Sequence, residues 1–273
     1  MRLLVIGGSG YLGREVVRQA VVAGDEVSAS YFSTPPPGVD AHRLDITRRP
    51  DVAELVTRLR PEAVVNAAYR QSDWATTAEG AMHVAAATAS VGCRFVHVSS
   101  DALFSGAATS YDETARPDPV HMYGAAKAAA EVAVAGLHPA AAIVRTSLIV
   151  GNGDSPTEKF VHAIASGAKP GVLFTDDIKS PVHVADLAAA LLELARSESA
   201  AGIHHVAGAE AISRHELGVL IARRDGLDET ALPTGLRADS GVGGPADVRL
   251  DCTATQARLA VRLRGAHEFM LQP

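Results

Sequence analysis

Three side chains in the middle of the chain have the types and spacing needed to donate a proton to a carbonyl group. Tyr123 and Lys127 are four residues apart, so a helix that begins near Met122 places both on one face. A nearby ammonium stabilises a phenolate, and we therefore expect Lys127 to lower the pKa of Tyr123. Ser100 ends an apolar strand and is followed by Asp101, so its hydroxyl can hydrogen-bond the same carbonyl oxygen.

A second chemical signal is the glycine-rich stretch GGSGYLG at residues 7–13. It follows a short apolar segment and precedes one whose apolar residues have helical spacing. Glycines in such a turn let the backbone approach a pyrophosphate, and the following helix N-terminus attracts its negative charge. This strand–turn–helix context favours dinucleotide binding over a plain structural turn. The expected cofactor contacts are Gly7, Gly10, Tyr11, Leu12 and Gly13.

The second predicted strand only weakly discriminates between NAD and NADP. An NAD site usually has a carboxylate at the end of this strand, about 20 residues after the glycines, to bind the ribose 2′-hydroxyl. This chain has SASYFS at residues 28–33, with no acid and no arginine. Without an acid there is no repulsion against a 2′-phosphate, so the sequence favours NADP and leaves NAD open.

Two further short motifs follow strand ends and are expected to contact the cofactor. Asp45 and Ile46 are placed to flank the adenine, although a solvated surface carboxylate is an equally good interpretation of Asp45. Asn66, Ala67 and Ala68 are small enough to let the cofactor lie close to the backbone, and ordinary packing is the alternative.

Alternation of strands and helices determines the expected fold class. Strands are expected at residues 2–6, 26–31, 63–67, 94–98 and 140–145, with the end of a third strand at 44–46, and helices at 11–23, 51–59, 76–91 and 122–135. This order predicts an α/β fold, a Rossmann-like doubly wound parallel sheet with a smaller C-terminal substrate-binding region. We expect a dinucleotide-binding domain over residues 1–150. Residues 151–273 should mainly bind substrate, with helices at 157–166, 184–196 and 213–225, a strand at 202–207, a loop at 236–244, and some segments returning to the sheet.

Composition narrows the functional classes. The formal net charge of −6 argues against nucleic acid or a membrane surface as the main partner. No apolar run reaches the length of a membrane span, and no signal peptide is visible at the start. The two cysteines have no metal-binding spacing, and the 11 histidines form no metal motif on a predicted helix. We expect a cytoplasmic protein that binds a small molecule and no metal.

Taken in order, the motifs resemble those of the extended short-chain dehydrogenase/reductase superfamily over the whole chain. Within it, the chain is most similar to the dTDP-4-dehydrorhamnose reductase-like, sugar-nucleotide-binding branch. The motifs that carry the resemblance are the loop at 7–13, Asp45-Ile46, Asn66-Ala67-Ala68, Ser99-Ser100-Asp101 with Phe104 and Gly106, Tyr111-Asp112-Glu113-Thr114, Pro119, Tyr123-Gly124-x-x-Lys127 and Arg145-Thr146-Ser147.

The resemblance implies a role for each matching position. Tyr123 would exchange a proton with the substrate oxygen, and Lys127 would bind the nicotinamide ribose. Ser100 and Asp101 would bind the keto oxygen and the sugar, although the Ser99 hydroxyl could replace that of Ser100. Ser147 would contact the substrate. The implied reaction is hydride transfer from NADPH or NADH to the keto group of a nucleotide-linked 4-keto-6-deoxysugar, and a homodimer is expected by analogy.

The chain departs from the family pattern at three positions. Thr77 replaces an asparagine that in many relatives supports the catalytic lysine, Leu148 replaces an aromatic residue, and Gly244 replaces an arginine before Pro245. The identity of the substrate, and whether any residue supports Lys127, therefore stay open. The alternative functions are a sugar-nucleotide epimerase or dehydratase and a non-catalytic regulatory subunit that binds cofactor. The cations available for a pyrophosphate are Arg145, Lys159, Arg214, Arg237 and Arg249.

Overall fold

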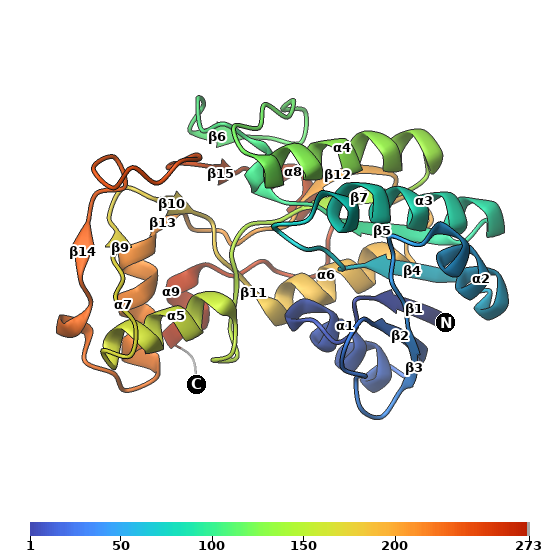
Figure 1. Cartoon of the computed structure of the whole chain (residues 1–273), viewed down its shortest axis with the longest axis horizontal. Helices are drawn as coiled ribbons and strands as arrows, with labels where there is room; N and C mark the ends of the chain where they lie inside the picture. The colour runs from blue at the N-terminus through green and yellow to red at the C-terminus, as the bar shows by residue number, and fades with distance from the viewer. Residues whose placement is uncertain (272–273) are drawn as a thin grey trace.

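The computed structural model describes residues 1–271, and its centre is a parallel sheet of seven strands (Figure 1). The strand order is β12-β7-β5-β4-β1-β2-β3, with every neighbouring pair parallel. The strands are β1 (Arg2–Ile6), β2 (Glu26–Tyr31), β3 (Asp40–Arg43), β4 (Ala63–Asn66), β5 (Arg94–Val98), β7 (Ala142–Arg145) and β12 (Gly202–His205). The order runs outward from β1 in both directions, which confirms the predicted doubly wound sheet.

Helices cover both faces of the sheet, which explains why its central strands are apolar along their whole length. On one face lie α1 (Tyr11–Val22) and α6 (Val184–Arg196); on the other lie α2 (Arg49–Leu59), α3 (Gly80–Val91) and α4 (Met122–Leu137). Each helix buries a stripe of small apolar side chains, such as Val16, Val17 and Ala20 on α1. None of the helices in residues 1–271 has the length and apolar composition of a transmembrane span.

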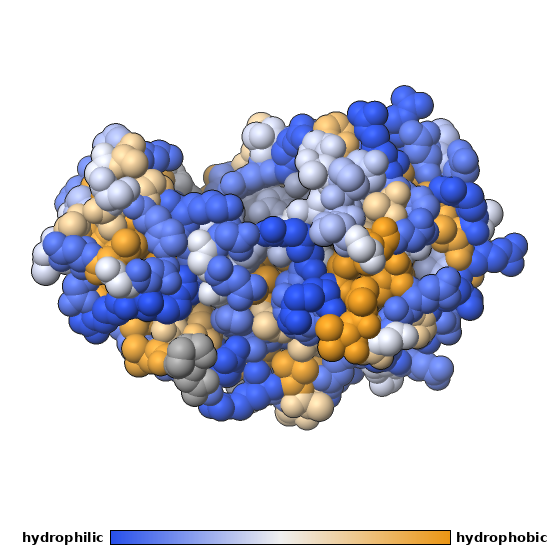
Figure 2. Space-filling model, turned by 90° about the horizontal axis from the view of Figure 1, so that it is seen from below, coloured by the Kyte–Doolittle hydropathy of each residue, from blue (hydrophilic) through white to orange (hydrophobic). Residues whose placement is uncertain are grey.

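The C-terminal region lies beside the sheet and has a hydrophobic core of its own (Figure 1). It contains α5 (Pro156–Ala165), α7 (Arg214–Arg224), η3 (Glu229–Ala231) and α9 (Ala266–Leu271), with the strand pairs β9 (Leu173–Phe174) with β14 (Thr234–Gly235) and β10 (Ile178–Lys179) with β13 (Ile212–Ser213). Figure 2 shows a mainly hydrophilic face whose outline is indented between this region, at the left, and the rest of the molecule.

Short elements join the two parts of the molecule. The pairs are β6 (Ser110–Tyr111) with β15 (Arg249–Leu250), and β8 (Ile149–Val150) with β11 (Val182–His183); α8 (Thr253–Gln256), η1 (Ala75–Glu79) and η2 (Asp101–Leu103) complete the elements. The chain returns to the sheet through α6 and β12, so segments from both halves of the sequence build it. The division at residue 150 stays a prediction.

Two predicted elements differ from the structure. Residues 44–46 are expected to be the end of the third strand, but β3 already ends at Arg43. The Asp45 carboxylate accepts hydrogen bonds from the Thr47 N–H and hydroxyl (3.0 and 2.7 Å), which forms a local turn instead. The single helix expected at 76–91 is a π-helical turn, η1, that continues into α3.

Gly124 lets α4 approach η2 more closely than any other residue would. A Cβ at this position would lie 2.1 Å from the carbonyl oxygen of Ala102. The first turn of α4 is also fixed by His121, whose Nδ1 accepts the Gly124 N–H at 2.9 Å as an N-cap. The position of Tyr123 relative to Ser100 therefore depends on a glycine and a cap.

Replacing Gly124 by alanine should destabilise the protein by about 1–3 kcal/mol, because the new methyl group must displace backbone. Gly136, further along the same helix, has open space around its Cβ position, so Gly136→Ala should stabilise by about 0.5–1 kcal/mol. Urea unfolding of the two variants provides the comparison. Equal effects of the same sign would contradict the proposed close packing of α4 on η2.

Candidate active site

One cavity of about 910 Å³ opens at the carboxyl ends of the parallel strands, where α/β sheets bind their ligands. Most of the residues predicted to bind cofactor or substrate line it, although Asn66 does not. These residues are Gly7, Gly10, Tyr11, Leu12, Gly13, Asp45, Ile46, Ala67, Ala68, Ser100, Asp101, Tyr123, Lys127 and Ser147. The structure thus brings together residues that are up to 140 positions apart, although their individual roles stay predictions.

The glycine-rich turn has the shape of a phosphate-binding loop. Gly7 has φ +82°, and a Cβ on Gly13 would lie 2.1 Å from the Gly7 carbonyl oxygen, so the sequence pattern is sterically required. No side chain caps the N-terminus of α1, which leaves its first N–H groups available to a pyrophosphate. The loop therefore fits the dinucleotide that the sequence predicts.

Lys127 is a buried cation at the end of β5. Its Nζ donates a hydrogen bond to the Val98 carbonyl oxygen at 2.9 Å and lies 5.1 Å from the centroid of the Tyr69 ring. Burial lowers the pKa of Lys127 to about 8, and the negative charge of Glu131, one turn further along α4, opposes this shift. The lysine is charged at neutral pH but close to losing its proton.

Tyr123 lies between two other rings, with Tyr69 at 5.9 Å and His121 stacked at 6.3 Å, measured between centroids. Burial raises the pKa of Tyr123 well above its ordinary value, and the Ser100 hydroxyl lowers it in part. The expected lowering by Lys127 is therefore wrong: desolvation of the phenol dominates, and the ammonium is directed at the Val98 carbonyl. A phenol with a raised pKa stays protonated at neutral pH, as a proton donor must.

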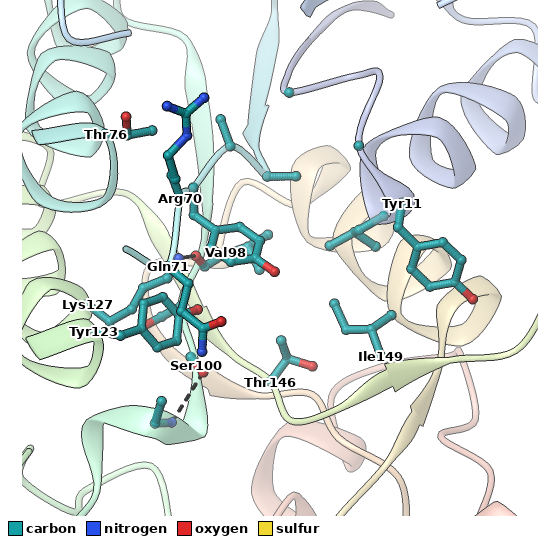
Figure 3. Close-up of a pocket in the computed structure, with 18 of the residues that line it drawn as sticks. Tyr11, Arg70, Gln71, Thr76, Val98, Ser100, Tyr123, Lys127, Thr146 and Ile149 are labelled. Atoms are coloured by element: carbon teal, nitrogen blue, oxygen red, sulfur yellow. Dashed lines mark hydrogen bonds between the residues drawn. The ribbon is translucent and has the colours of Figure 1, made fainter. Parts of the chain in front are cut away.

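The two neighbouring serines have different tasks. Ser99 is buried, and its hydroxyl donates to the Glu131 carboxylate at 2.5 Å. The Ser100 hydroxyl accepts the Ala102 N–H at 3.2 Å and donates a long hydrogen bond to Asp101 Oδ1 at 3.3 Å. It lies on the same side of the cavity as Tyr123 and Lys127 (Figure 3). Ser99 is thus engaged in the protein interior, which leaves Ser100 as the hydroxyl available to a substrate.

Glu131 also explains why Arg145, one of the cations that the sequence makes available, does not line the cavity. The Arg145 guanidinium forms a bidentate ion pair with Glu131 (2.9 and 3.1 Å) and is almost completely buried. It also lies over the Phe104 ring at 5.1 Å. Arg145 is therefore a structural residue behind the site and does not face a pyrophosphate.

Asp101 and Ser147 bind each other, and an unpaired hydroxyl lies beside them. The Ser147 hydroxyl donates to Asp101 Oδ2 at 2.7 Å, which fixes both side chains. Thr146 Oγ1 is buried and has no hydrogen-bond partner within residues 1–271. It lies between Ser100 and Ile149 in the cavity (Figure 3), where a bound ligand can satisfy it. The sequence motif contained Thr146, but its availability depends on contacts that only the structure gives.

Cations from the C-terminal region form the opposite wall of the cavity. Lys179, Arg214 and Arg237 all line it and surround the buried carboxylate of Asp177, at 3.6, 3.6 and 2.6 Å. Arg237 Nε is buried without a partner among the described residues. Of the other cations that the sequence makes available, Arg249 pairs with Asp247 at 2.7 Å, and neither it nor Lys159 lines the cavity.

Comparison with known proteins decides the family. The family model described as RmlD substrate binding domain matches residues 1–268. The chain belongs to this family. It is 33% identical over 229 residues to a dTDP-4-dehydrorhamnose reductase of Mycobacterium tuberculosis, covering 78% of this chain and 72% of that protein. A probable low-salt glycan biosynthesis reductase of Haloferax volcanii is 32% identical over 256 residues, with 88% and 85% covered.

The solved structures confirm the fold. The dTDP-4-dehydrorhamnose reductase of Bacillus anthracis in complex with NADP superposes with a TM-score of 0.86 over 98% of this chain and 96% of that chain, at 23% identity. The family confirms the branch predicted from the motifs and its enzyme class, an NAD(P)-dependent oxidoreductase.

The three departures from the family pattern have different structural settings. Thr77 is buried in η1, where its hydroxyl donates to the Arg70 carbonyl at 2.7 Å and accepts the Arg70 N–H at 3.2 Å. It therefore holds the loop after β4 and makes no hydrogen bond to Lys127. Leu148 lines the cavity as an aliphatic residue, and Gly244, at φ +103°, lies against Arg237.

Raising the pH from 7 to 9.5 should weaken binding of the reduced cofactor, with a midpoint near pH 8. Below that pH Lys127 carries the charge that attracts the ribose and phosphate oxygens, and above it the charge is lost. Fluorescence titration with NADPH measures the change. Lys127→Met serves as the control and should bind weakly at every pH without this step; an unchanged affinity up to pH 9.5 in the native protein would contradict the assignment.

Proposed function

We propose that this protein reduces the keto group of a nucleotide-linked 4-keto-6-deoxysugar with NADPH or NADH. The observation that carries the proposal is the convergence of Lys127, Tyr123 and Ser100 on one side of a cavity whose other parts hold a phosphate-binding loop and a cationic wall. The names of the relatives, which are reductases of dTDP-linked keto sugars, support the same reaction.

The chain's own groups can perform the proton chemistry. The bound nicotinamide would supply the hydride. Tyr123, protonated because its pKa is raised, would donate a proton to the substrate oxygen as charge develops there. The Ser100 hydroxyl would hydrogen-bond the same oxygen and orient it. Lys127 would bind the nicotinamide ribose, and the unpaired Thr146 hydroxyl would hydrogen-bond a polar group of the cofactor or the sugar.

The substrate class follows from the wall opposite the catalytic residues. Three cations surround the single buried carboxylate of Asp177, and the orphaned Nε of Arg237 can donate to a phosphate oxygen. A diphosphate linker supplies the negative charge that this wall lacks. We infer that Lys179, Arg214 and Arg237 bind the linker, while Asp101 and Ser147 bind the sugar.

Two predictions about the setting of the enzyme stay predictions. A homodimer is expected from the resemblance to the family. A cytoplasmic location is expected from the sequence, and the two cysteines, Cys93 and Cys252, are unpaired thiols.

Incubating the protein with NADPH and dTDP-4-keto-6-deoxyglucose should oxidise one NADPH for each sugar reduced. The free sugar, which lacks the diphosphate, should be reduced much more slowly because it does not reach the cationic wall. Absorbance at the NADPH band and mass analysis of the product measure both. Conversion with only catalytic amounts of cofactor would indicate an epimerase, and binding without any conversion would indicate a non-catalytic subunit.

A further inference from the structure

A pair of arginines flanks Phe32, the residue that follows β2. The Arg70 guanidinium lies over the Phe32 ring at 5.4 Å, and Arg43, at the end of β3, donates from Nε to the Phe32 carbonyl at 3.4 Å. Arg70 comes from the loop after β4, which Thr77 holds in place through both backbone groups of Arg70. Three separate segments therefore meet at Phe32, which lines the cavity together with Arg70.

Neither arginine forms an ion pair within residues 1–271, although carboxylates lie nearby. Asp40 accepts hydrogen bonds from Ser28 and His42, and Asp45 accepts two from Thr47. Asp73 is close enough to Arg70 for the positive charge to lower its pKa, but its oxygens accept from Thr76 at 2.7 and 3.4 Å. The acids around this corner are thus engaged locally, and the two guanidinium groups keep their charge for an anion.

The location indicates which anion this is. In dinucleotide-binding sheets the end of the second strand contacts the adenosine ribose, and an arginine nearby accommodates a 2′-phosphate. Phe32 and Arg70 both line the cavity that contains the glycine-rich loop. We propose that Arg70 binds the 2′-phosphate of NADP, with Arg43 adding positive charge behind it, and that the protein therefore prefers NADPH over NADH.

This arrangement differs from the usual one, because the specificity residue is not on β2. The second strand ends in Phe32, which has no charge of its own; its ring supports the planar guanidinium, a contact that an arginine makes and a lysine makes poorly. The proposal rests on the proposed function only in that both require a dinucleotide at this loop. It does not depend on the sugar substrate.

The test uses adenosine fragments, so that it needs no turnover. Isothermal titration calorimetry of the native protein should give a Kd for 2′,5′-ADP that is lower than that for 5′-AMP by about tenfold or more. The reason is that only 2′,5′-ADP has the 2′-phosphate, which can accept charge-assisted hydrogen bonds from Arg70. Arg70→Gln should abolish most of this difference while leaving the Kd for 5′-AMP within about twofold. Arg43→Gln should reduce the difference by a smaller factor. The same ranking is expected for NADPH against NADH.

Arg262→Gln is the matched control, because Arg262 is an exposed arginine that pairs with Glu268, and it should leave both affinities unchanged. An equal loss for 2′,5′-ADP and 5′-AMP in Arg70→Gln would overturn the proposal and show that Arg70 stacks on the adenine instead. A native protein that binds both fragments equally would also overturn it, without affecting the reductase reaction. Failure to bind either fragment or either dinucleotide would instead contradict the proposed function.

Discussion

A buried ammonium group organises the candidate active site of this protein. Removing the Lys127 charge from water is costly, and the structure offsets that cost with the Val98 carbonyl, the face of Tyr69 and the nearby Glu131 carboxylate. Because the Val98 carbonyl is the last of β5 and Lys127 is on the first turns of α4, this contact fixes the helix against the strand end. Tyr123 is one helical turn before Lys127, and Ser100 is two residues after Val98. The distance between Tyr123 and Ser100 therefore depends on the same contact.

A second layer behind the site keeps this arrangement rigid. Glu131 accepts hydrogen bonds from Ser99 and Arg145, and so joins α4 to β5 and β7. Each of these groups would be costly to bury alone, and together they satisfy one another. The consequence for function is a division of labour between adjacent residues: Ser99 is engaged in the interior and Ser100 is left facing the cavity.

The sequence was sufficient to predict the sheet and most of the site, for physical reasons. Strands buried on both faces are continuous apolar runs, and parallel strands bring their carboxyl ends to one edge, so the glycine-rich loop, Asp45, Ala67 and Ser100 had to meet. The sequence was not sufficient where contacts between distant segments determine the state of a side chain. The pKa of Tyr123 is set by burial, Arg145 is neutralised by Glu131, and Arg70 is brought to Phe32 across the fold.

The most direct test of the account is the rate of substrate reduction by Tyr123→Phe. We expect kcat to fall by about 10²- to 10⁴-fold, because the phenol that donates the proton is gone while the ring between Tyr69 and His121 remains. The affinity for NADPH and the thermal stability should stay close to those of the native protein. A kcat within a few-fold of the native value would contradict the role of Tyr123 as the proton donor.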